Sequence, residues 1–269
     1  LNRESIKKTY LTENISLQYL KKKIYFYLFE RRFLNQIKYF HALTSAELKE
    51  IRFLFRDKTI KILSTGFKID PKKNLKIKKE LMNIFDNKKK ILLFMSRLDE
   101  QKGLLELINC WQKLSKDLEK NSWWLLIAGF GPLSEAVINA SKIANSRIIF
   151  NGPIFGDEKE FVLQKSNGFI LPSFNEGLPI SLLEALSFNN TCLITKNCNM
   201  NKLLEEKIAF EITSNKNELN IKGALRKLFK LSEGDFQKRG NLGKEYIKKN
   251  HNWAEIICEY ISFYKSLEN

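Results

Sequence analysis

The sequence predicts an α/β fold with a doubly wound, mostly parallel sheet. Short runs of apolar or β-branched residues recur along the chain, and helical patterns separate them through turns that contain Gly or Pro. The apolar runs do not alternate with polar residues, which is typical of strands covered on both faces. Strand–helix alternation of this kind builds right-handed βαβ units.

The strands and helices follow one another in a regular order. The predicted strands are Thr59–Leu63, Ile91–Met95, Trp123–Ala128, Arg147–Phe150, Gly168–Leu171 and Cys192–Thr195. The predicted helices cover residues 104–119, 132–144, 157–165, 179–188 and 200–206, and the part after Asn215 is mostly helical and ends with Trp253–Leu267. Phe40–Ser45 is predicted to be one more short strand, with a Thr/Ser cap for the helix that follows.

Composition limits the class of protein. With 269 residues, 43% of them hydrophobic, the chain can bury a core, which excludes wholesale disorder. At about 150 residues per domain, it holds a little under two domains. The four Cys form no C-x-x-C pair and there are two His, so a zinc site and a disulfide-stapled scaffold are excluded and a reducing compartment is expected. The sequence contains no run of about 18 apolar residues, so no segment is predicted to span a bilayer.

The net charge of +16 is unevenly placed. Residues 1–60 carry 13 basic and 6 acidic side chains and residues 61–90 carry 10 and 3, whereas residues 91–190 carry 9 and 11. Nucleic-acid binding would rest on the net charge alone, because no recognition helix or aromatic RNA-binding signature accompanies it. We therefore expect no nucleic-acid partner.

The first forty residues mix cations with aromatic side chains, as in the stretch from Tyr19 to Phe33. Apolar residues fall on every side of this stretch, so a helix there would need burial or a membrane interface. Two interpretations stay open: the stretch packs against another part of the protein, or it contacts an anionic membrane surface.

Ligands of an open α/β sheet bind at the carboxyl ends of its strands, so the strand-to-helix turns are the informative segments. In the first turn, Arg97 and Lys102 stand five residues apart beside a predicted helix start. Two cations and free backbone N–H groups there suit a diphosphate, although an ordinary Arg and a surface Lys would give the same pattern. The second turn contains Gly129 and Gly131 but has Ser134 at the third glycine position of a dinucleotide fingerprint, so these glycines are expected to serve the turn or a ligand's approach.

The third turn runs from Pro172 to Leu186 and contains Glu176 and Glu184. At helical rise, two carboxylates eight residues apart are separated by about 12 Å, which could match the reach from a transferred sugar to a ribose. The alternative is a capping Glu176 and a Glu184 paired with a neighbouring Lys.

Together these turns resemble the group 1 family of nucleotide-sugar glycosyltransferases. The residues that carry the resemblance are Arg97, Lys102-Gly103, Gly129-Phe130-Gly131-Pro132, Asn151-Gly152 and Asn175-Glu176-Gly177 with Glu184-Ala185, in the same order and spacing from about Ala42 to Trp253. The resemblance implies a GT-B fold: a remnant of an acceptor-side domain in residues 1–57, a Rossmann-like donor-binding domain in residues 58–250, and a helix in residues 251–269 that packs back on the N-terminal part. The family usually has Gly at Ser96 and a Gly-rich segment at residues 197–201, and the sequence departs from it there.

The resemblance also implies roles for individual residues. Arg97 and Lys102 would bind the donor diphosphate, Glu184 the ribose, and Glu176 would sit against the donor sugar as the candidate catalytic residue. The remaining expected donor-binding residues are Gly129, Gly131, Asn175, Gly177, Leu178 and Pro179.

The expected activity is transfer of a sugar from a UDP- or GDP-sugar to a saccharide or lipid-linked acceptor, with retention of anomeric configuration, as in a hexosyltransferase of bacterial surface polysaccharide or lipopolysaccharide synthesis. The chain has no Asp-x-Asp, so fixed cations and a helix N-terminus would replace a metal, and neither metal nor cofactor is expected. The expected location is the cytoplasm, at the inner face of the membrane. The alternative is a donor-binding fragment without turnover, because the acceptor domain would be incomplete.

Overall fold

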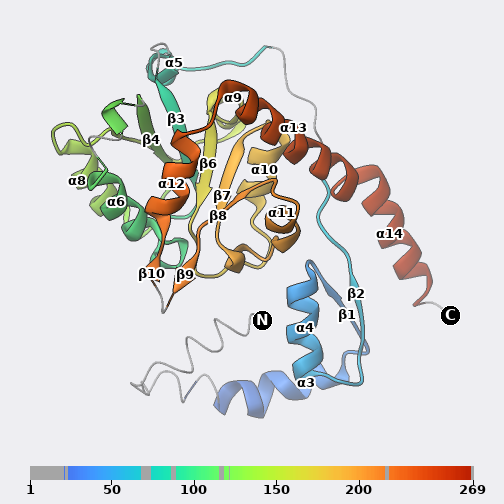
Figure 1. Cartoon of the computed structure of the whole chain (residues 1–269). Coiled ribbons are helices and arrows are strands. Elements are labelled where there is room, and N and C mark those ends of the chain that lie inside the picture. Colours follow the sequence, from blue (N-terminus) through green and yellow to red (C-terminus); the bar gives the residue numbers. More distant parts are fainter. Residues whose placement is uncertain are drawn as a thin grey trace. The chain divides into compact units, whose positions relative to one another are not determined.

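The computed structural model describes residues 21, 24–67, 74–85, 89–114, 118–120, 122–215 and 218–267 (Figure 1). The chain divides into two compact units, one within residues 1–66 and 253–269 and one within residues 67–252. Each unit is described by itself.

The second unit is built on a six-stranded sheet in which all strands are parallel. Its strands are β3 (Lys90–Met95), β4 (Trp123–Ala128), β5 (Ile148–Gly152), β6 (Gly168–Leu171), β7 (Thr191–Ile194) and β8 (Phe210–Glu211). They lie in the order β5-β4-β3-β6-β7-β8, so the chain first builds outward from β3 in one direction and then returns to build in the other. The strand order therefore reverses between β3 and β6, where an open sheet forms its ligand crevice.

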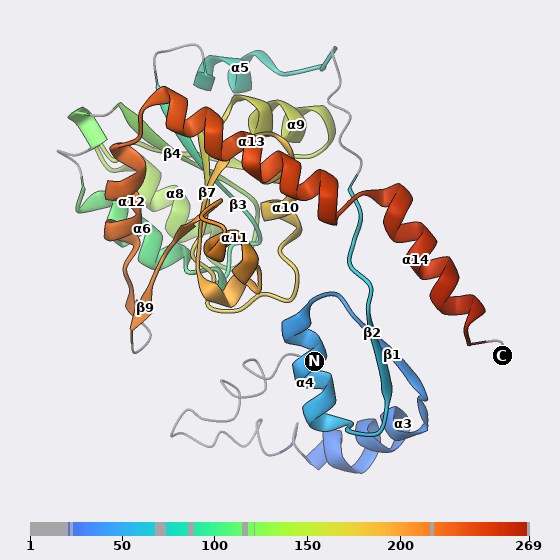
Figure 2. The same ribbon diagram turned by 45° about the vertical axis from the view of Figure 1, so that its right-hand side comes forward.

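Helices cover both faces of this sheet, with α6, α8 and α12 on one face and α9, α10 and α13 on the other (Figures 1 and 2). Every residue of β6 and β7 is buried, which explains why these strands show no polar alternation. The helices of this unit are α5 (Lys79–Phe85), α6 (Leu104–Gln112), α8 (Ser134–Lys142), α9 (Gly156–Lys165), α10 (Ile180–Ser187), α11 (Asn201–Glu205), α12 (Ile221–Phe229) and α13 (Glu233–Asn250). Its other elements among the described residues include two short 3-10 turns, η2 (Glu100–Lys102) and η3 (Lys196–Cys198), and the hairpin of β9 (Ser214–Asn215) and β10 (Glu218–Leu219).

The α/β fold class with its parallel sheet is confirmed, and the strands predicted in this unit agree with the observed ones to within one or two residues at their ends. Two predictions were wrong in detail. The helix predicted over 104–119 ends as α6 at Gln112, where Leu114 N–H bonds to the carbonyl of Trp111 and tightens the last turn. Strand β8 was missed because two residues are too few to show a pattern.

The first unit contains a parallel βαβ arrangement, in which β1 pairs with β2 and α4 connects them. Its elements are a π-helical turn η1 (Phe26–Glu30), α3 (Arg31–Gln36), β1 (Tyr39–Ala42), α4 (Ser45–Leu54), β2 (Thr59–Ile62) and α14 (Trp253–Lys265). The strand predicted over Phe40–Ser45 is shorter than expected, because Thr44 caps α4 by accepting a hydrogen bond from Glu47 N–H. Helix α14 belongs to this unit, and Tyr260 donates a 3.2 Å hydrogen bond to the carbonyl of Leu63.

The domain limits predicted from the sequence stay a prediction. In the structure, residues 58–66 group with the first unit, because β2 forms its hydrogen bonds with β1. Part of the basic aromatic stretch, including Tyr19, Lys22 and Lys23, lies outside the described residues. None of the helices within the described ranges combines the length and the apolarity that a bilayer crossing requires.

Cysteine reactivity offers a direct check of the core. Cys192 and Cys198 are buried, and burial raises the pKa of both thiols, that of Cys198 to about 12. Cys110 is half-buried with a raised pKa, again through burial, and Cys258 is exposed on α14. Because the thiolate is the reactive form, alkylation at pH 8 should modify Cys258 first, Cys110 more slowly, and the other two on unfolding. Mass spectrometry of alkylated peptides over time checks this order; modification of Cys198 as fast as Cys258 would contradict the packing of η3 against the end of β6.

Candidate functional site

A cavity of about 440 Å³ lies in the second unit, at the carboxyl ends of strands β3 to β6. Residues from four strand-to-helix segments line it, and they fall within 95–102 for β3, 128–130 for β4, 153–159 for β5 and 176–184 for β6. These are the strands on both sides of the point where the strand order reverses, so the cavity occupies the crevice expected for an open α/β sheet.

Seven of the predicted site residues line this cavity: Arg97, Lys102, Gly129, Glu176, Leu178, Pro179 and Glu184. Gly131, Asn175 and Gly177 do not line it. A Cβ on Gly131 would lie 2.4 Å from the carbonyl oxygen of Leu98, and one on Gly129 would lie 2.0 Å from that of Ser96. These two glycines therefore let the turn after β4 pack directly on the turn after β3, which shapes the cavity wall. The space around Gly177 holds nothing within 4 Å of a Cβ, so packing does not require a glycine there.

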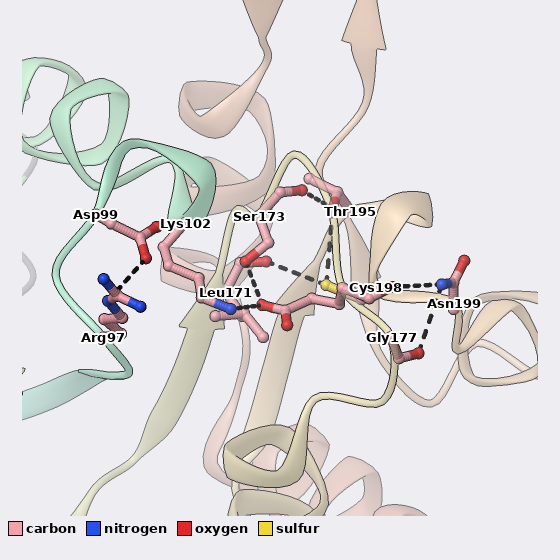
Figure 3. Close-up of polar contacts among 10 residues, drawn as sticks. Arg97, Asp99, Lys102, Leu171, Ser173, Gly177, Thr195, Cys198 and Asn199 are labelled. Atoms are coloured by element: carbon pink, nitrogen blue, oxygen red, sulfur yellow. Dashed lines mark hydrogen bonds and ion pairs between the residues drawn. The ribbon is translucent and has the colours of Figure 1, made fainter. Parts of the chain in front are cut away.

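Glu176 is held by two hydrogen bonds to the same oxygen. Lys102 Nζ lies 2.7 Å from Glu176 Oε1, and Ser173 Oγ donates to Oε1 at 2.7 Å (Figure 3). The side chains of Lys102 and Glu176 are 18% and 10% exposed, and Ser173 is fully buried, so this is a largely desolvated ion pair. Such charge-assisted hydrogen bonds are about twice as strong as neutral ones.

The backbone around this pair is tied together from two sides. Phe174 N–H donates to the carbonyl of Gln101 at 2.8 Å, which joins the turn after β6 to the turn that carries Lys102. Thr195, at the end of β7, donates through Oγ1 to the carbonyl of Ser173 at 2.5 Å. Cys198 Sγ lies 3.6 Å from the carbonyl of Leu171 and contacts Thr195 (Figure 3). The turn after β3 and the segment after β7 thus fix the position of Ser173, and through it that of the carboxylate.

The segment 197–199 clamps the backbone of Glu176 itself. Glu176 N–H donates to the carbonyl of Asn197 at 3.0 Å, and Asn199 Nδ2 donates to the carbonyl of Glu176 at 2.5 Å and to that of Gly177 at 3.5 Å. Asn199 adopts a left-handed φ of 56°, a conformation that Asn tolerates and that turns its amide toward the loop. This is the segment in which the sequence departs from the family pattern, and the structure shows it as a support for the loop (Figure 3).

Glu184 lies on the second turn of α10 and forms an ion pair with Lys159 of α9, at 2.6 Å between Nζ and Oε1. Both side chains line the cavity, as does Ser181 one turn before Glu184. The alternative in which Glu184 pairs with a lysine therefore describes the structure, but its companion, a capping Glu176, does not, because no side chain caps α10. The estimate of about 12 Å between the carboxylates at helical rise was also wrong in its premise, since α10 begins at Ile180 and Glu176 lies in the loop before it.

Arg97 lies at the opposite side of the turn after β3. Its Nε is 3.5 Å from Asp99 Oδ2, and its side chain is 70% exposed, so it is the least constrained cation of the cavity (Figure 3). Lys102 closes η2, and Gly103, with a left-handed φ of 64°, leads into α6. Within the described residues, no group of three or more His, Cys, Asp or Glu side chains could hold a metal ion.

Sequence reasoning missed Ser173, Lys159 and Asn199. Lys159 and Asn199 have no signal in spacing, because each acts through a residue far along the chain: Lys159 and Glu184 are 25 residues apart, and Asn199 and Glu176 are 23 apart. Ser173 stands three residues before Glu176 and two residues after the predicted strand Gly168–Leu171, and this position could have indicated a supporting role.

Known proteins similar to this chain agree on one family. The sequence model of "Glycosyl transferases group 1" matches residues 76–249. An uncharacterized glycosyltransferase of Methanocaldococcus jannaschii is 26% identical over 94% of this chain and 70% of its own length. A Campylobacter jejuni enzyme named as an α-1,4-N-acetyl-D-galactosaminyltransferase that acts on an undecaprenol-linked saccharide is 28% identical over 52% of this chain and 41% of its own length.

Among solved structures, Anabaena HepE in complex with UDP-glucose superposes with a TM-score of 0.68 at 13% identity, over 84% of this chain and 63% of HepE. At this identity the similarity shows the fold, which is of the GT-B type. The chain thus spans less than two thirds of HepE and less than half of the Campylobacter enzyme. The family match covers more than half of the chain, from before β3 to the end of α13, and includes every segment that lines the cavity. The chain therefore belongs to the group 1 glycosyltransferases.

Proposed function

We propose that the chain binds a nucleoside diphosphate sugar in the cavity at the carboxyl ends of β3 to β6 and transfers the sugar, with retention of anomeric configuration, to a saccharide or lipid-linked acceptor. One observation carries this proposal: three cations and two carboxylates converge in one cavity, and the carboxylates belong to two different Lys–Glu pairs, Lys102–Glu176 and Lys159–Glu184. A donor that offers both a dianionic diphosphate and hydroxyl groups matches this mixed set.

The proposed roles follow from where the groups lie. Arg97 and Lys102 flank the turn after β3 and would bind the diphosphate, as paired cations commonly do. Glu184 would accept hydrogen bonds from the ribose hydroxyls. Glu176, fixed by Ser173 and Lys102, would sit against the sugar.

The chemistry explains why these charges are needed. Breaking the bond between the anomeric carbon and the phosphate oxygen leaves positive charge on the sugar and adds negative charge to the departing diphosphate. Arg97 and Lys102 would stabilise the leaving group, and the carboxylate of Glu176 would stabilise the developing positive charge on the sugar. We propose that these fixed charges do this without a metal ion.

The donor base, UDP or GDP, and a hexose as the transferred sugar are part of the proposal. UDP-glucose in the HepE complex supports a uridine nucleotide, and the undecaprenol-linked saccharide named for the Campylobacter enzyme supports a lipid-linked acceptor. A role in bacterial surface polysaccharide or lipopolysaccharide synthesis on the cytoplasmic side of the membrane follows from such an acceptor.

Calorimetric titration of the full chain with UDP, GDP and their glucose conjugates tests the proposal. We expect at least one of these to bind, with the same affinity in EDTA as in Mg²⁺, and the Arg97→Ala variant to bind it more weakly. No binding of any of them, or binding that EDTA abolishes, would contradict the proposal. Binding without any transfer or hydrolysis of the sugar would instead support the alternative of a donor-binding chain without turnover.

The hydrogen bonds from Asn199 to the carbonyls of Glu176 and Gly177 lead to a further expected result. Asn199→Gly keeps the left-handed backbone and removes both amide hydrogen bonds to the loop. Because a net hydrogen bond contributes about 1 kcal/mol, we expect the affinity for the nucleotide sugar to fall several-fold. Asn189→Gly is the matched control: Asn189 has a φ of 62° and donates to Asn241 Oδ1, away from the cavity. Equal effects of the two substitutions in calorimetry would contradict a role for Asn199 in holding the loop.

Peripheral contact with an anionic membrane is a second proposal, carried by the exposed aromatic side chains of the first unit. Three aromatic side chains are more than half exposed: Tyr25 directly before η1, Phe29 in η1 and Phe33 in α3. The guanidinium carbon of Arg31 lies 5.3 Å from the ring centre of Tyr27. Aromatic rings beside cations suit an anionic lipid interface. Co-sedimentation with vesicles that contain phosphatidylglycerol should retain the protein at low salt; no binding there would exclude this proposal.

A further inference from the structure

Lys159 is a cavity residue that neither the sequence patterns nor the family resemblance singled out. It lies on the first turn of α9, lines the cavity after β5, and places its Nζ 2.6 Å from Oε1 of Glu184. Its side chain is 35% exposed and that of Glu184 is 20% exposed. A pair this close and partly desolvated is better defined than the usual ion pair on a protein surface.

We propose that Lys159 is a positioning residue for the donor's ribose: it holds the carboxylate of Glu184 in the orientation that accepts two vicinal hydroxyls, and so sets how strongly the site prefers a ribonucleotide to a deoxynucleotide. This inference rests on the proposed function, in which Glu184 binds the ribose.

The carboxylate of Glu184 can accept hydrogen bonds from Lys159 and from the ribose at the same time. An ionised carboxylate has about four lone-pair positions, and Lys159 engages one oxygen, Oε1. A pair of vicinal hydroxyls can therefore bind Glu184 while Lys159 remains in place. Without the ammonium group, the Glu184 side chain would have several rotamers open to it, and fixing one of them would be a cost of binding.

The backbone that carries Lys159 is itself anchored. Asp157 accepts a 3.1 Å hydrogen bond from Lys76 N–H, and Glu158 forms a 3.2 Å ion pair with Lys78. Residues 76 and 78 thus hold the first turn of α9, and with it the backbone from which the Lys159 side chain extends.

The positive charge of Lys159 also favours binding of a nucleoside diphosphate. The charged side chains that line it are Arg97, Lys102 and Lys159 on the positive side and Glu176 and Glu184 on the negative side. Lys159 gives this set its excess of positive charge, which reduces the repulsion between Glu184 and an incoming diphosphate. That effect acts on every nucleoside diphosphate alike, whereas positioning acts through the ribose hydroxyls, and the two can be measured separately.

The test compares nucleotides with and without the hydroxyls. Calorimetry would give the dissociation constants of UDP and GDP and of their 2′,3′-dideoxy forms for the unchanged chain, Lys159→Met, Lys159→Arg and Lys165→Met. We expect removal of the hydroxyls to weaken binding to the unchanged chain by about tenfold or more, as for hydrogen bonds to a charged group. That penalty should fall to less than about threefold in Lys159→Met and be largely kept in Lys159→Arg.

Lys165→Met is the matched control, because Lys165 lies on the last turn of the same helix, is exposed and does not line the cavity. It should leave the penalty unchanged, and circular dichroism should show all variants folded. An undiminished penalty in Lys159→Met, or an equal weakening of all nucleotides, would overturn the positioning role. If the unchanged chain bound the dideoxy nucleotides as tightly as UDP and GDP, the positioning role would be overturned but donor binding would stand. If the chain bound no nucleotide at all, both the positioning role and the proposed function would be overturned.

Discussion

Lys102→Met is expected to weaken binding of the nucleoside diphosphate by about 100-fold or more and to lower the thermal stability of the second unit. Lys102 is the largely buried partner of Glu176, whose side chain is 10% exposed in the pair. Truncating one partner of a buried, hydrogen-bonded charge pair costs about 2–5 kcal/mol, because the remaining charge stays desolvated. Calorimetry measures the first effect and thermal unfolding followed by circular dichroism the second.

A second substitution separates the two effects. In Lys102→Met combined with Glu176→Gln the buried carboxylate is gone, so much of the lost stability should return while nucleotide affinity stays low. Lys113→Met, at the exposed end of α6, is the control and should change neither quantity. A Lys102→Met variant that unfolds at the original temperature and binds the nucleotide normally would refute the assignment of Lys102 to the diphosphate.

Glu176→Gln is expected to lower turnover of the nucleotide sugar by about 10²–10³-fold, the range seen when one preorganised group that stabilises transition-state charge is removed. The amide oxygen can still accept hydrogen bonds from Lys102 and Ser173, so the loop should keep its structure. The affinity for UDP or GDP alone should change little, because the diphosphate and ribose contacts remain. Steady-state release of the nucleoside diphosphate measures turnover, and calorimetry measures affinity.

The matched control for this substitution is Glu135→Gln on the exposed first turn of α8. The two variants lose the same charge, but the control residue does not line the cavity. Turnover within about threefold of the unchanged chain in Glu176→Gln would show that Glu176 does not stabilise charge at the reacting centre. A parallel loss in Glu135→Gln would show that net charge alone is responsible.

The sequence predicted the parallel sheet because its strands are continuous apolar runs, as in β6 and β7, where every residue is buried. It also directed attention to the turns after β3 and β6, because residues at the carboxyl ends of neighbouring parallel strands meet. Ends of elements were harder: α6 is shorter than its pattern because its last turn tightens at Leu114, and β8 is too short to show any pattern.

Within the candidate site, the residue types at Arg97, Lys102, Glu176 and Glu184 could be predicted, but their partners could not. The residues of the pair Lys102–Glu176 are 74 positions apart in the sequence. The hydrogen bond from Asn199 to the Glu176 carbonyl depends on how the turn after β7 packs against the loop after β6. The spacing of Glu176 and Glu184 misled the estimate of their separation because a loop, not helix, lies between Glu176 and the start of α10. Such contacts follow from the packing of the sheet and appear only in three dimensions.

A crystal structure of the full chain with UDP or GDP, whichever binds more tightly, tests the central claim most directly. We expect the nucleotide in the cavity at the carboxyl ends of β3 to β6, with ribose hydroxyl oxygens about 2.5–3.0 Å from the Glu184 carboxylate and the diphosphate in contact with Lys102 and Arg97. A nucleotide bound elsewhere, or bound in this cavity with its ribose away from Glu184 and its phosphates away from Lys102, would contradict it.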